Sequence, residues 1–138
     1  MKDSLKTGLE TTRRIEIDVE RTIGFMGEEL RVYATPSMVR DIEQTCKDWL
    51  QQHLDDGQNS VGARVEIDHL GATLAGMWVE VHATVVEIDR RRITFEAEVH
   101  DELGDKVGAC RHTRFVVDLD KQKERLDAKR ARLAEARG

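Results

Sequence analysis

The chain has 138 residues, of which 36% are charged and 4% are aromatic, and its net charge is −5. This length is typical of a single domain, so we expect one unit over residues 1–138 with a mostly aliphatic core. The acidic balance gives no reason to expect a nucleic acid or an anionic membrane surface as a partner.

The cysteines and the lengths of the apolar runs indicate in which cellular compartment the protein is expected. Cys46 and Cys110 lie in aliphatic surroundings and have no CxxC spacing, which argues against a disulfide framework and a metal or redox pair. The first 14 residues lack the apolar core of a signal peptide, and no run approaches the length of a membrane span. We therefore expect a soluble, cytoplasmic protein with no membrane partner.

The N-terminal part is predicted to contain one strand. Residues 1–13 are polar, and we expect them to be only partly ordered. Residues 14–21 alternate Ile15, Ile17 and Val19 with acidic side chains, which is the pattern of a half-buried strand. Residues 22–30 read as a loop with some apolar content.

The central element is a helix predicted at residues 33–53. Thr35 and Pro36 form a helix-start signature, because Thr can cap the first turn and Pro fits the first helical position. Glu43 lies on the apolar stripe of this helix, where a carboxylate is costly unless it is paired or functional. Those apolar residues recur at the spacing of one buried helical face: Met38, Val39, Ile42, Cys46, Trp49 and Leu50.

Four further strands are predicted at about 61–69, 76–89, 93–100 and 107–119. They are joined mainly by short turns, so they are expected to form an antiparallel sheet. In the first of them, His69 falls in phase with the apolar residues. Residues 120–138 are helix-prone and 11 of these 19 are charged, which favours a solvated helical tail over a coiled coil or a nucleic-acid arm.

One long helix among antiparallel strands has one obvious packing, in which the sheet curls around the helix and each buries the other. The fold class is therefore α+β, in the hot-dog arrangement, with its core at 14–119. A single sheet of this size leaves edges exposed, so we expect a homodimer.

Three polar side chains stand where a purely structural domain would not need them: Thr35, Glu43 and His69. Each has a simple structural explanation, as a helix cap, as an ion-pair partner of Arg40 or Lys47, and as a satisfied core histidine. Together, a hydroxyl, a carboxylate and an imidazole beside a helix N-terminus form a plausible acyl-transfer site. The free N–H groups there suit a developing oxyanion.

Three motifs in order carry a resemblance to a known family. They are A-T-P-x-M-V with a Glu eight residues after the Thr, at Ala34 to Glu43; H-x-x-A-T-x-x-G, at His69 to Gly76; and G-x-x-x-H-x-R, at Gly108 to Arg114. Over about residues 8–120 the chain resembles the hot-dog thioesterases of the fluoroacetyl-CoA thioesterase type. The resemblance implies catalytic roles for Thr35, Glu43 and His69. It also implies a homodimer that hydrolyses a short acyl-CoA without a metal or prosthetic group, with CoA along the dimer interface.

The stretch before the helix, GFMGEELRVY, lacks the aromatic-rich lid of the fluoroacetyl-specific enzyme, so a general acyl-CoA thioesterase is expected. Further substrate-binding candidates are Gly76, Arg111, His112 and Arg114. Candidates for the CoA phosphates are Arg90, Arg91, Arg92, Arg111 and Arg114, with the alternative that Arg90 to Arg92 form simply an exposed turn.

Two alternatives stay open on the sequence. One is a non-catalytic acyl-CoA-binding or regulatory module, because a fold does not prove an activity. The other is hydration of an enoyl thioester, for which no Asp/His motif of the hydratase type is present. Whether Glu43 activates water or attacks the thioester itself, and whether Thr35 orients the carboxylate or acts as the nucleophile, is also open.

Overall fold

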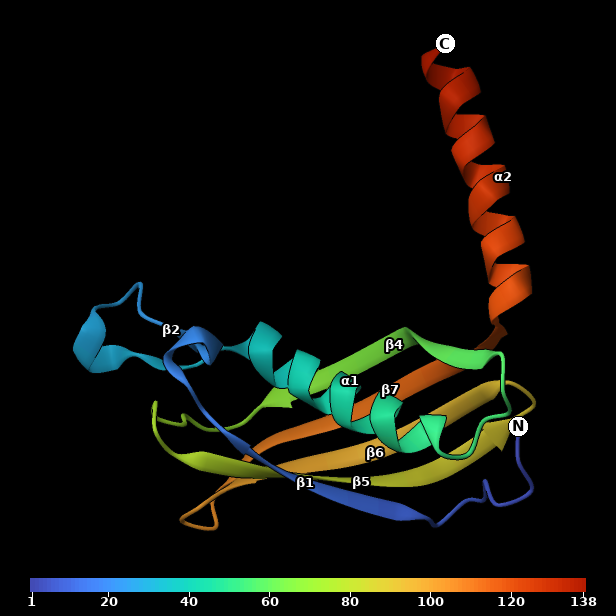
Figure 1. The fold of residues 1–138 in the computed structure, drawn as a ribbon. Coiled ribbons are helices and arrows are strands. Elements are labelled where there is room, and N and C mark those ends of the chain that lie inside the picture. Colours follow the sequence, from blue (N-terminus) through green and yellow to red (C-terminus); the bar gives the residue numbers. More distant parts are fainter.

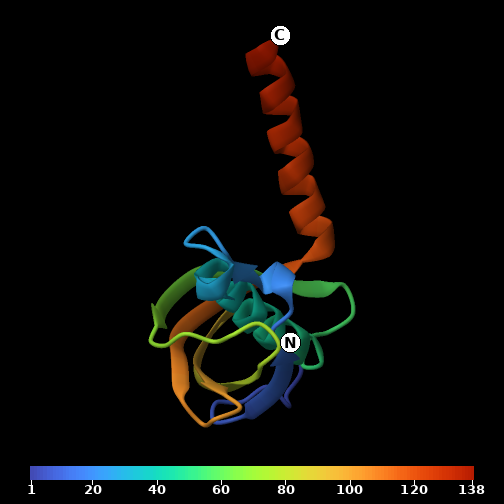
Figure 2. The ribbon, with the colours of Figure 1, turned by 90° about the vertical axis from the view of Figure 1, so that its left-hand side faces the viewer.

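A computed structural model describes residues 1–138. Five antiparallel strands in the order β1-β5-β6-β7-β4 curl around the helix α1 (Figures 1 and 2). The α+β hot-dog fold predicted from the sequence is confirmed. The bounds are β1 Glu10–Glu16, α1 Thr35–Gln51, β4 Gln58–His69, β5 Trp78–Asp89, β6 Arg92–Asp101, β7 Lys106–Asp118 and α2 Leu119–Arg137.

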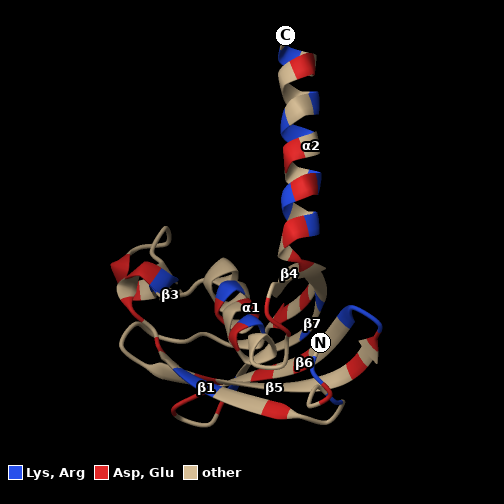
Figure 3. Cartoon of the chain, turned by 45° about the vertical axis from the view of Figure 1, so that its right-hand side comes forward, with Lys and Arg blue, Asp and Glu red and all other residues tan.

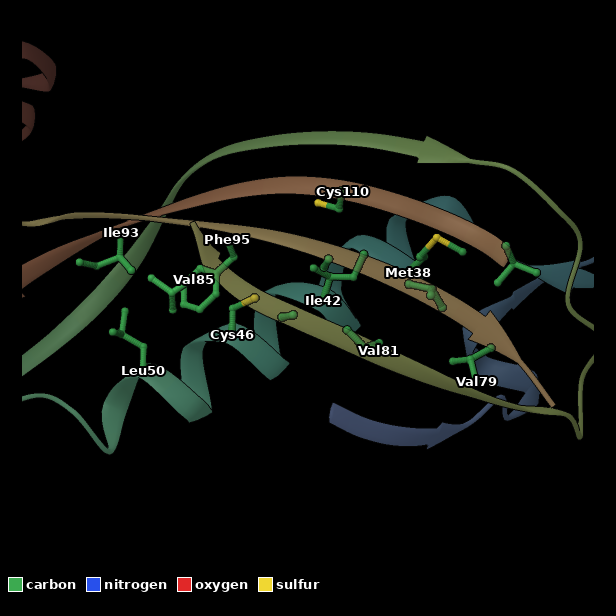
Figure 4. Packing of buried hydrophobic residues seen from close by; sticks show 14 of the residues in the cluster. Met38, Ile42, Cys46, Leu50, Val79, Val81, Val85, Ile93, Phe95 and Cys110 are labelled. Carbon is green, nitrogen blue, oxygen red and sulfur yellow. The ribbon is translucent and has the colours of Figure 1, made fainter. Parts of the chain in front are cut away.

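The core lies between α1 and the concave face of the sheet. Met38, Ile42, Cys46 and Leu50 form the buried stripe of α1. They pack against alternate residues of β5 and β6, as Figure 4 shows for Val79, Val81, Val85, Ile93 and Phe95. The apolar residues that recur along the helix therefore pack against those that alternate along the strands, and together they form one mostly aliphatic layer, as the composition predicted.

The start of α1 differs from the prediction in one respect that bears on function. Ala34, not Thr35, occupies the cap position, and no side chain caps the free N–H groups of the first turn. Pro36 still stands in that first turn. The capping role predicted for Thr35 is wrong, because its hydroxyl is bonded elsewhere.

The first strand begins earlier than predicted and ends earlier. It runs over Glu10–Glu16 rather than residues 14–21, and it pairs with β5 along its whole length. The segment before it is also tied down: the N–H of Lys2 donates to the carbonyl of His53, and Leu5 is buried. These long-range hydrogen bonds order a polar segment whose sequence alone predicts little structure.

Between β1 and α1 the chain forms two one-turn helices, Val19–Arg21 and Glu28–Leu30, and two short strands, β2 Thr22–Ile23 and β3 Val32–Tyr33. The two strands pair with each other as a small separate sheet, and Val32 also forms an isolated antiparallel bridge with Leu74. Phe25 and Met26 lie at its exposed tip. The predicted loop is therefore a short hairpin that leads into α1 (Figure 1).

Strand β4 forms one edge of the sheet and pairs only with β7. Most of it is exposed, including Val61 and Val65, which the sequence pattern assigned to a buried phase. Val61 pairs with Phe115 on the outer face, because the register shift between Gly62 and Arg64 reverses the alternation there, and Val65, opposite His112, is exposed at the open edge. Twelve residues with an unpaired row of backbone N–H and C=O groups thus face outward.

Helix α2 confirms the predicted helical tail and projects away from the sheet (Figure 1). None of its residues is buried. No helix in the structure combines the length and apolar character needed to cross a membrane.

Candidate active site

Thr35 and His69 meet at the start of α1. The hydroxyl of Thr35 and Nδ1 of His69 share a hydrogen bond of 2.6 Å. Thr35 opens the helix and His69 ends β4, so the contact joins residues 34 positions apart in the sequence. Because Nδ1 is engaged, Nε2 is the ring nitrogen left for another group.

The backbone around this pair is suited to an anion. The first N–H groups of an α-helix have no intrahelical partners, and here no side chain satisfies them. The first turn also contains no acidic residue. The positive end of the helix is therefore free to stabilise negative charge next to the Thr35 hydroxyl and the His69 ring.

A buried network fixes the position of this pair. The hydroxyl of Tyr33 donates to Asp41 at 2.5 Å, and Nε of Arg21 donates to both carboxylate oxygens of Asp41, the closer at 3.0 Å. The ring of Tyr33 contacts the His69 ring edge-on, with 6.4 Å between centroids. Burial, followed by the hydrogen bond to Asp41, raises the pKa of Tyr33 above its usual value, so this hydroxyl stays protonated.

Glu43 lies two turns farther along α1. Its carboxylate is 37% exposed and lies 3.5 Å from Nη1 of Arg114, a side chain that is only 4% exposed. The partners considered from the sequence, Arg40 and Lys47, form no ion pair with it. Glu43 therefore does not enter the core. It lies at the rim, within reach of water and beside a buried cation.

Arg114 is held by three other groups. Its Nε donates to the hydroxyl of Ser60 at 2.8 Å and its Nη2 to the carbonyl of Ser60 at 3.0 Å. Its Nη1 lies 3.1 Å from Nε2 of His112, whose Nδ1 lies 2.8 Å from the carbonyl of Arg64. Since a carbonyl only accepts, Nδ1 of His112 carries the proton and Nε2 accepts from Arg114.

The burial of His112 leads to a pH prediction. Burial, the larger cause, and the charge of Arg114 lower the pKa of His112 below its ordinary value of 6.5. The unfolded chain therefore binds a proton that the folded chain does not, and stability falls as the pH drops below 6.5. The slope is at most about 1.4 kcal/mol per pH unit for this group.

This slope is measurable by urea unfolding at pH 7.5, 6.5 and 5.5. His112→Asn, which keeps a side-chain N–H donor, is expected to unfold with a flatter dependence over this window. An equal dependence in the variant and the parent would show that other groups cause it.

Gly62 provides the space that the Glu43 carboxylate occupies. A Cβ at Gly62 would lie 2.5 Å from Oε2 of Glu43, 3.5 Å from Nη1 of Arg114 and 3.5 Å from the His112 ring. A real Cβ does not approach an oxygen so closely. Only glycine at this position of β4 lets Glu43 lie over the strand next to Arg114.

Gly62→Ala is therefore expected to displace the Glu43 carboxylate and to lower any activity that depends on it by about tenfold or more. Gly71→Ala is the matched control, because its Cβ would make only ordinary van der Waals contacts, with Val107 at 3.4 Å and the carbonyl of Lys106 at 3.8 Å. Thioester hydrolysis by both variants is the measurement. Equal rates in the two variants would show that the position of Glu43 does not matter.

Thr35 and Glu43 do not meet within one chain. Eight residues of α-helix correspond to about 12 Å along the axis, and no hydrogen bond joins Glu43 to Thr35 or His69. The structure thus brings together Thr35 with His69, and Glu43 with His112 and Arg114, as two separate halves.

The remaining candidates lie elsewhere. Arg111 is on the outer face of the sheet, with Nη1 2.8 Å from Glu96, because strand alternation directs it opposite to His112 and Arg114. Its substrate-binding role stays a prediction, separate from the cluster of His112 and Arg114. Gly76 has φ +91° in the turn before β5, where it donates its N–H to Ile17. The turn of Arg90 to Arg92 is at the far end of β5 from Gly76.

Comparison with known proteins adds the family. The model of a family described as fluoroacetyl-CoA-specific thioesterase matches residues 17–120. The chain belongs to this family. The fold and the enzyme class expected from the sequence, a hot-dog thioester hydrolase, are thereby confirmed.

Several individual proteins of the fold are similar to this member of the family. The fluoroacetyl-CoA thioesterase of Streptantibioticus cattleyicolor is 28% identical over 128 residues, which cover 88% of this chain and 91% of that protein. A thioesterase superfamily member from Thermus thermophilus has a TM-score of 0.89 at 27% identity, over 96% of this chain and 98% of that chain. A solved structure of the fluoroacetyl-CoA thioesterase has a TM-score of 0.82 at 26% identity, over 92% and 98% of the two chains.

Three residues of this family member's site escaped sequence reasoning. Asp41 lies on the flank of α1, and nothing in its spacing distinguishes it from a solvated carboxylate. Ser60 and Gly62 precede and flank a β-bulge, where the register between β4 and β7 shifts between Gly62 and Arg64. The one available signal was Gly62 itself, since a glycine within a strand often marks a bulge or a close approach.

Proposed function

We propose that this protein is an acyl-CoA thioesterase that hydrolyses a short acyl-CoA to the free acid and CoA. The hydrogen bond of 2.6 Å between Thr35 and His69 beside the uncapped start of α1 is the observation that carries this proposal. It gathers a hydroxyl, an imidazole and free N–H groups, which are the parts that acyl transfer needs. Related structures of the fluoroacetyl-CoA thioesterase contain CoA with fluoroacetate, or acetyl-CoA.

The start of α1 is the place we propose for the thioester carbonyl. Its oxygen accepts from the free N–H groups of the first helical turn, where the negative charge of the tetrahedral intermediate develops. Thr35 and His69 lie beside this oxygen. Nε2 of His69 is the group that gives a proton to the departing CoA thiolate.

Glu43 is the general base in this proposal. Its carboxylate is exposed enough to contact water and is oriented by Arg114. It removes a proton from the water molecule whose oxygen forms the new bond to the acyl carbon. The C–S bond then breaks, the thiolate takes its proton from His69, and the proton on Glu43 returns through solvent to His69, so that the products are the carboxylic acid and the CoA thiol and both residues regain their starting protonation.

A second copy of the chain brings the two halves together. We propose a homodimer in which β4 pairs antiparallel with the same strand of a second copy about a two-fold axis at Glu66. This register places Val65 opposite Ile67 of the partner subunit, which matches apolar side chains on the concave face. It also places Arg64 opposite Asp68 of the partner subunit, which matches opposite charges on the outer face.

The same register connects the two halves. Beyond the bulge at Ala63, Gly62 lies opposite His69 of the partner subunit. Since the Glu43 carboxylate lies over Gly62, it then faces the Thr35–His69 pair of the other copy. The exposed edge and the 12 Å separation within one chain both support a site built from two copies.

A panel of acyl-CoA esters of increasing chain length, with a thiol reagent to detect free CoA, tests the activity. The two cysteines will not contribute to the signal, because burial raises the pKa of the Cys46 thiol to about 12 and of the Cys110 thiol to about 11. We expect release of CoA from short acyl chains. Tight binding without release from any member of the panel would instead favour the non-catalytic acyl-CoA-binding module.

The setting that fits this proposal is the cytoplasm. Both cysteines are free thiols and both are buried. Free buried thiols are compatible with a reducing compartment, where acyl-CoA substrates are handled. We propose this location on that ground.

A further inference from the structure

A basic recess lies at the end of the sheet from which α2 departs. We use this name for Arg90, Arg91 and Arg92 of the β5–β6 turn, Phe115 of β7, and Lys121 and Arg125 of α2. These residues line two adjoining cavities of ≈ 540 and ≈ 170 Å³, which share Arg91 and Phe115. The cavities carry five basic side chains and two carboxylates, in a chain whose net charge is −5. In Figure 3 the turn of three arginines is the blue loop at this end of the sheet.

Most of the positive charge in the basic recess is unpaired. Arg91 is fixed, with Nη2 3.3 Å from Asp118 and Nη1 3.4 Å from the carbonyl of Val116. Arg90, Arg92 and Arg125 form no ion pair in the structure, whose ion pairs otherwise involve most of the arginines. Guanidinium groups without a carboxylate partner are the groups that bind phosphate oxygens in pairs of hydrogen bonds.

The floor of the basic recess is aromatic. Phe115 is 37% exposed, on the outer face of the sheet, between Val61 of β4 and Arg92 of β6. An exposed phenyl ring beside unpaired arginines offers a flat apolar surface and anion contacts together. A nucleobase with attached phosphate groups has both complementary parts.

The backbone conformation of Arg90 also supports a binding role for this turn. Arg90 has φ +56°, and it is the one residue other than glycine in the structure with a positive φ. This conformation costs a non-glycine residue about 1 kcal/mol or more, and tight hairpin turns normally use Asn or Gly for it. Strained positions of this kind gather at binding sites. Glycine or asparagine would form this turn at a lower conformational cost, so the arginine is explained better by the guanidinium that it supplies.

We propose that the basic recess binds a phosphorylated nucleoside, and that its source is the nucleotide end of the CoA substrate. This assignment rests on the proposed function. The position along β4 agrees with it, because Phe115 lies opposite Val61, the neighbour of Gly62 over which the Glu43 carboxylate lies; Phe115 is on the outer face and Glu43 on the concave face, so CoA would pass the open edge of β4 between them. The basic recess and Glu43 are therefore at the same end of β4.

The double variant Arg90→Gly, Arg125→Ala tests the proposal. Glycine at position 90 removes a guanidinium and also relieves the positive φ, so the variant is expected to fold as stably as the parent. The KM for an acyl-CoA is expected to rise about tenfold, the loss expected for charged hydrogen bonds, with kcat unchanged. The kinetics of the same acyl group on N-acetylcysteamine, which has no nucleotide, are expected to stay the same.

A matched control and a binding arm complete the experiment. Arg132→Ala removes the same charge from α2 two turns beyond Arg125, and it should change neither measurement. Titration with adenosine 3′,5′-bisphosphate, followed by calorimetry, reports binding without catalysis. Loss of this binding in the double variant with an unchanged KM for acyl-CoA would assign the site to a free nucleotide instead. The proposal is overturned if both quantities are unchanged, or if Arg132→Ala has an equal effect.

The two proposals fail separately. If the parent protein releases no CoA from any acyl-CoA, the proposed function fails, and the titration still decides whether the basic recess binds a nucleotide. If the parent hydrolyses acyl-CoA and the double variant matches it in both arms, only the assignment of the basic recess fails.

Discussion

Replacing Glu43 with glutamine is expected to lower kcat/KM for a short acyl-CoA by about 100-fold or more, the contribution of a positioned general base. The amide has nearly the size of the carboxylate and can still lie over Gly62, so the fold is retained. It cannot accept the proton of the attacking water. The loss is therefore expected mainly in kcat rather than in KM.

Glu96→Gln is the matched control for this change. Glu96 lies on the outer face of β6 and pairs with Arg111, away from α1. Its replacement makes the same change in charge and should leave the hydrolysis rate within about twofold of the parent, as expected for a surface position. Parent-like activity of Glu43→Gln would contradict the assignment of Glu43.

The second large effect concerns stability. Arg114→Leu is expected to lower the free energy of unfolding by about 2–4 kcal/mol, because it removes one member of a buried polar cluster. Ser60 and His112 lose their hydrogen-bond partner, and Glu43 loses its cation. The range of about 2–4 kcal/mol already includes only a small contribution from the ion pair with Glu43, because Glu43 is partly exposed and solvent screens its charge.

Arg111→Leu is the comparison that isolates burial. Arg111 is three residues earlier on the same strand, but its ion pairs with Glu96 and Glu87 are on the outer face and its side chain is 44% exposed. Such a pair contributes less than about 1 kcal/mol. Urea unfolding of the two variants measures the difference. Equal destabilisation would show that the cluster around Arg114 is not what stabilises the fold.

Residue spacing along the sequence predicted the central helix and three of the strands. The apolar spacing from Met38 to Leu50 predicted α1, and alternation predicted β5, β6 and β7 with nearly the observed bounds. The prediction of Thr35 as the helix cap was wrong, since the hydroxyl bonds to His69 instead. That contact depends on a residue 34 positions away, which no local rule includes.

The exposed edge of the sheet and the register of strand pairing could not be predicted from the sequence. Alternation in β4 indicated a buried face, but it does not show whether α1 or a second copy covers that face. The bulge between Gly62 and Arg64 shifts the register, and through it the space for Glu43. Alternation along β7 separates Arg111 from His112 and Arg114, as the common phase of the latter two already indicated.

The two halves of the site suggest a division of labour that the fold makes natural. The start of α1 holds Thr35 and His69 beside free N–H groups, where we propose that the thioester carbonyl binds. Farther along the same helix, Glu43 lies where the sheet edge is open. Edge pairing between two copies would join each half to the complementary half and cover the exposed strand at the same time.

The most direct test of this account uses two inactive variants together. Thr35→Ala and Glu43→Gln chains, co-expressed with different affinity tags, are purified in two steps so that only mixed dimers remain. A site built from two copies leaves one intact site in each mixed dimer, so the account predicts about half of the parent activity. Activity no higher than that of either variant alone would contradict it.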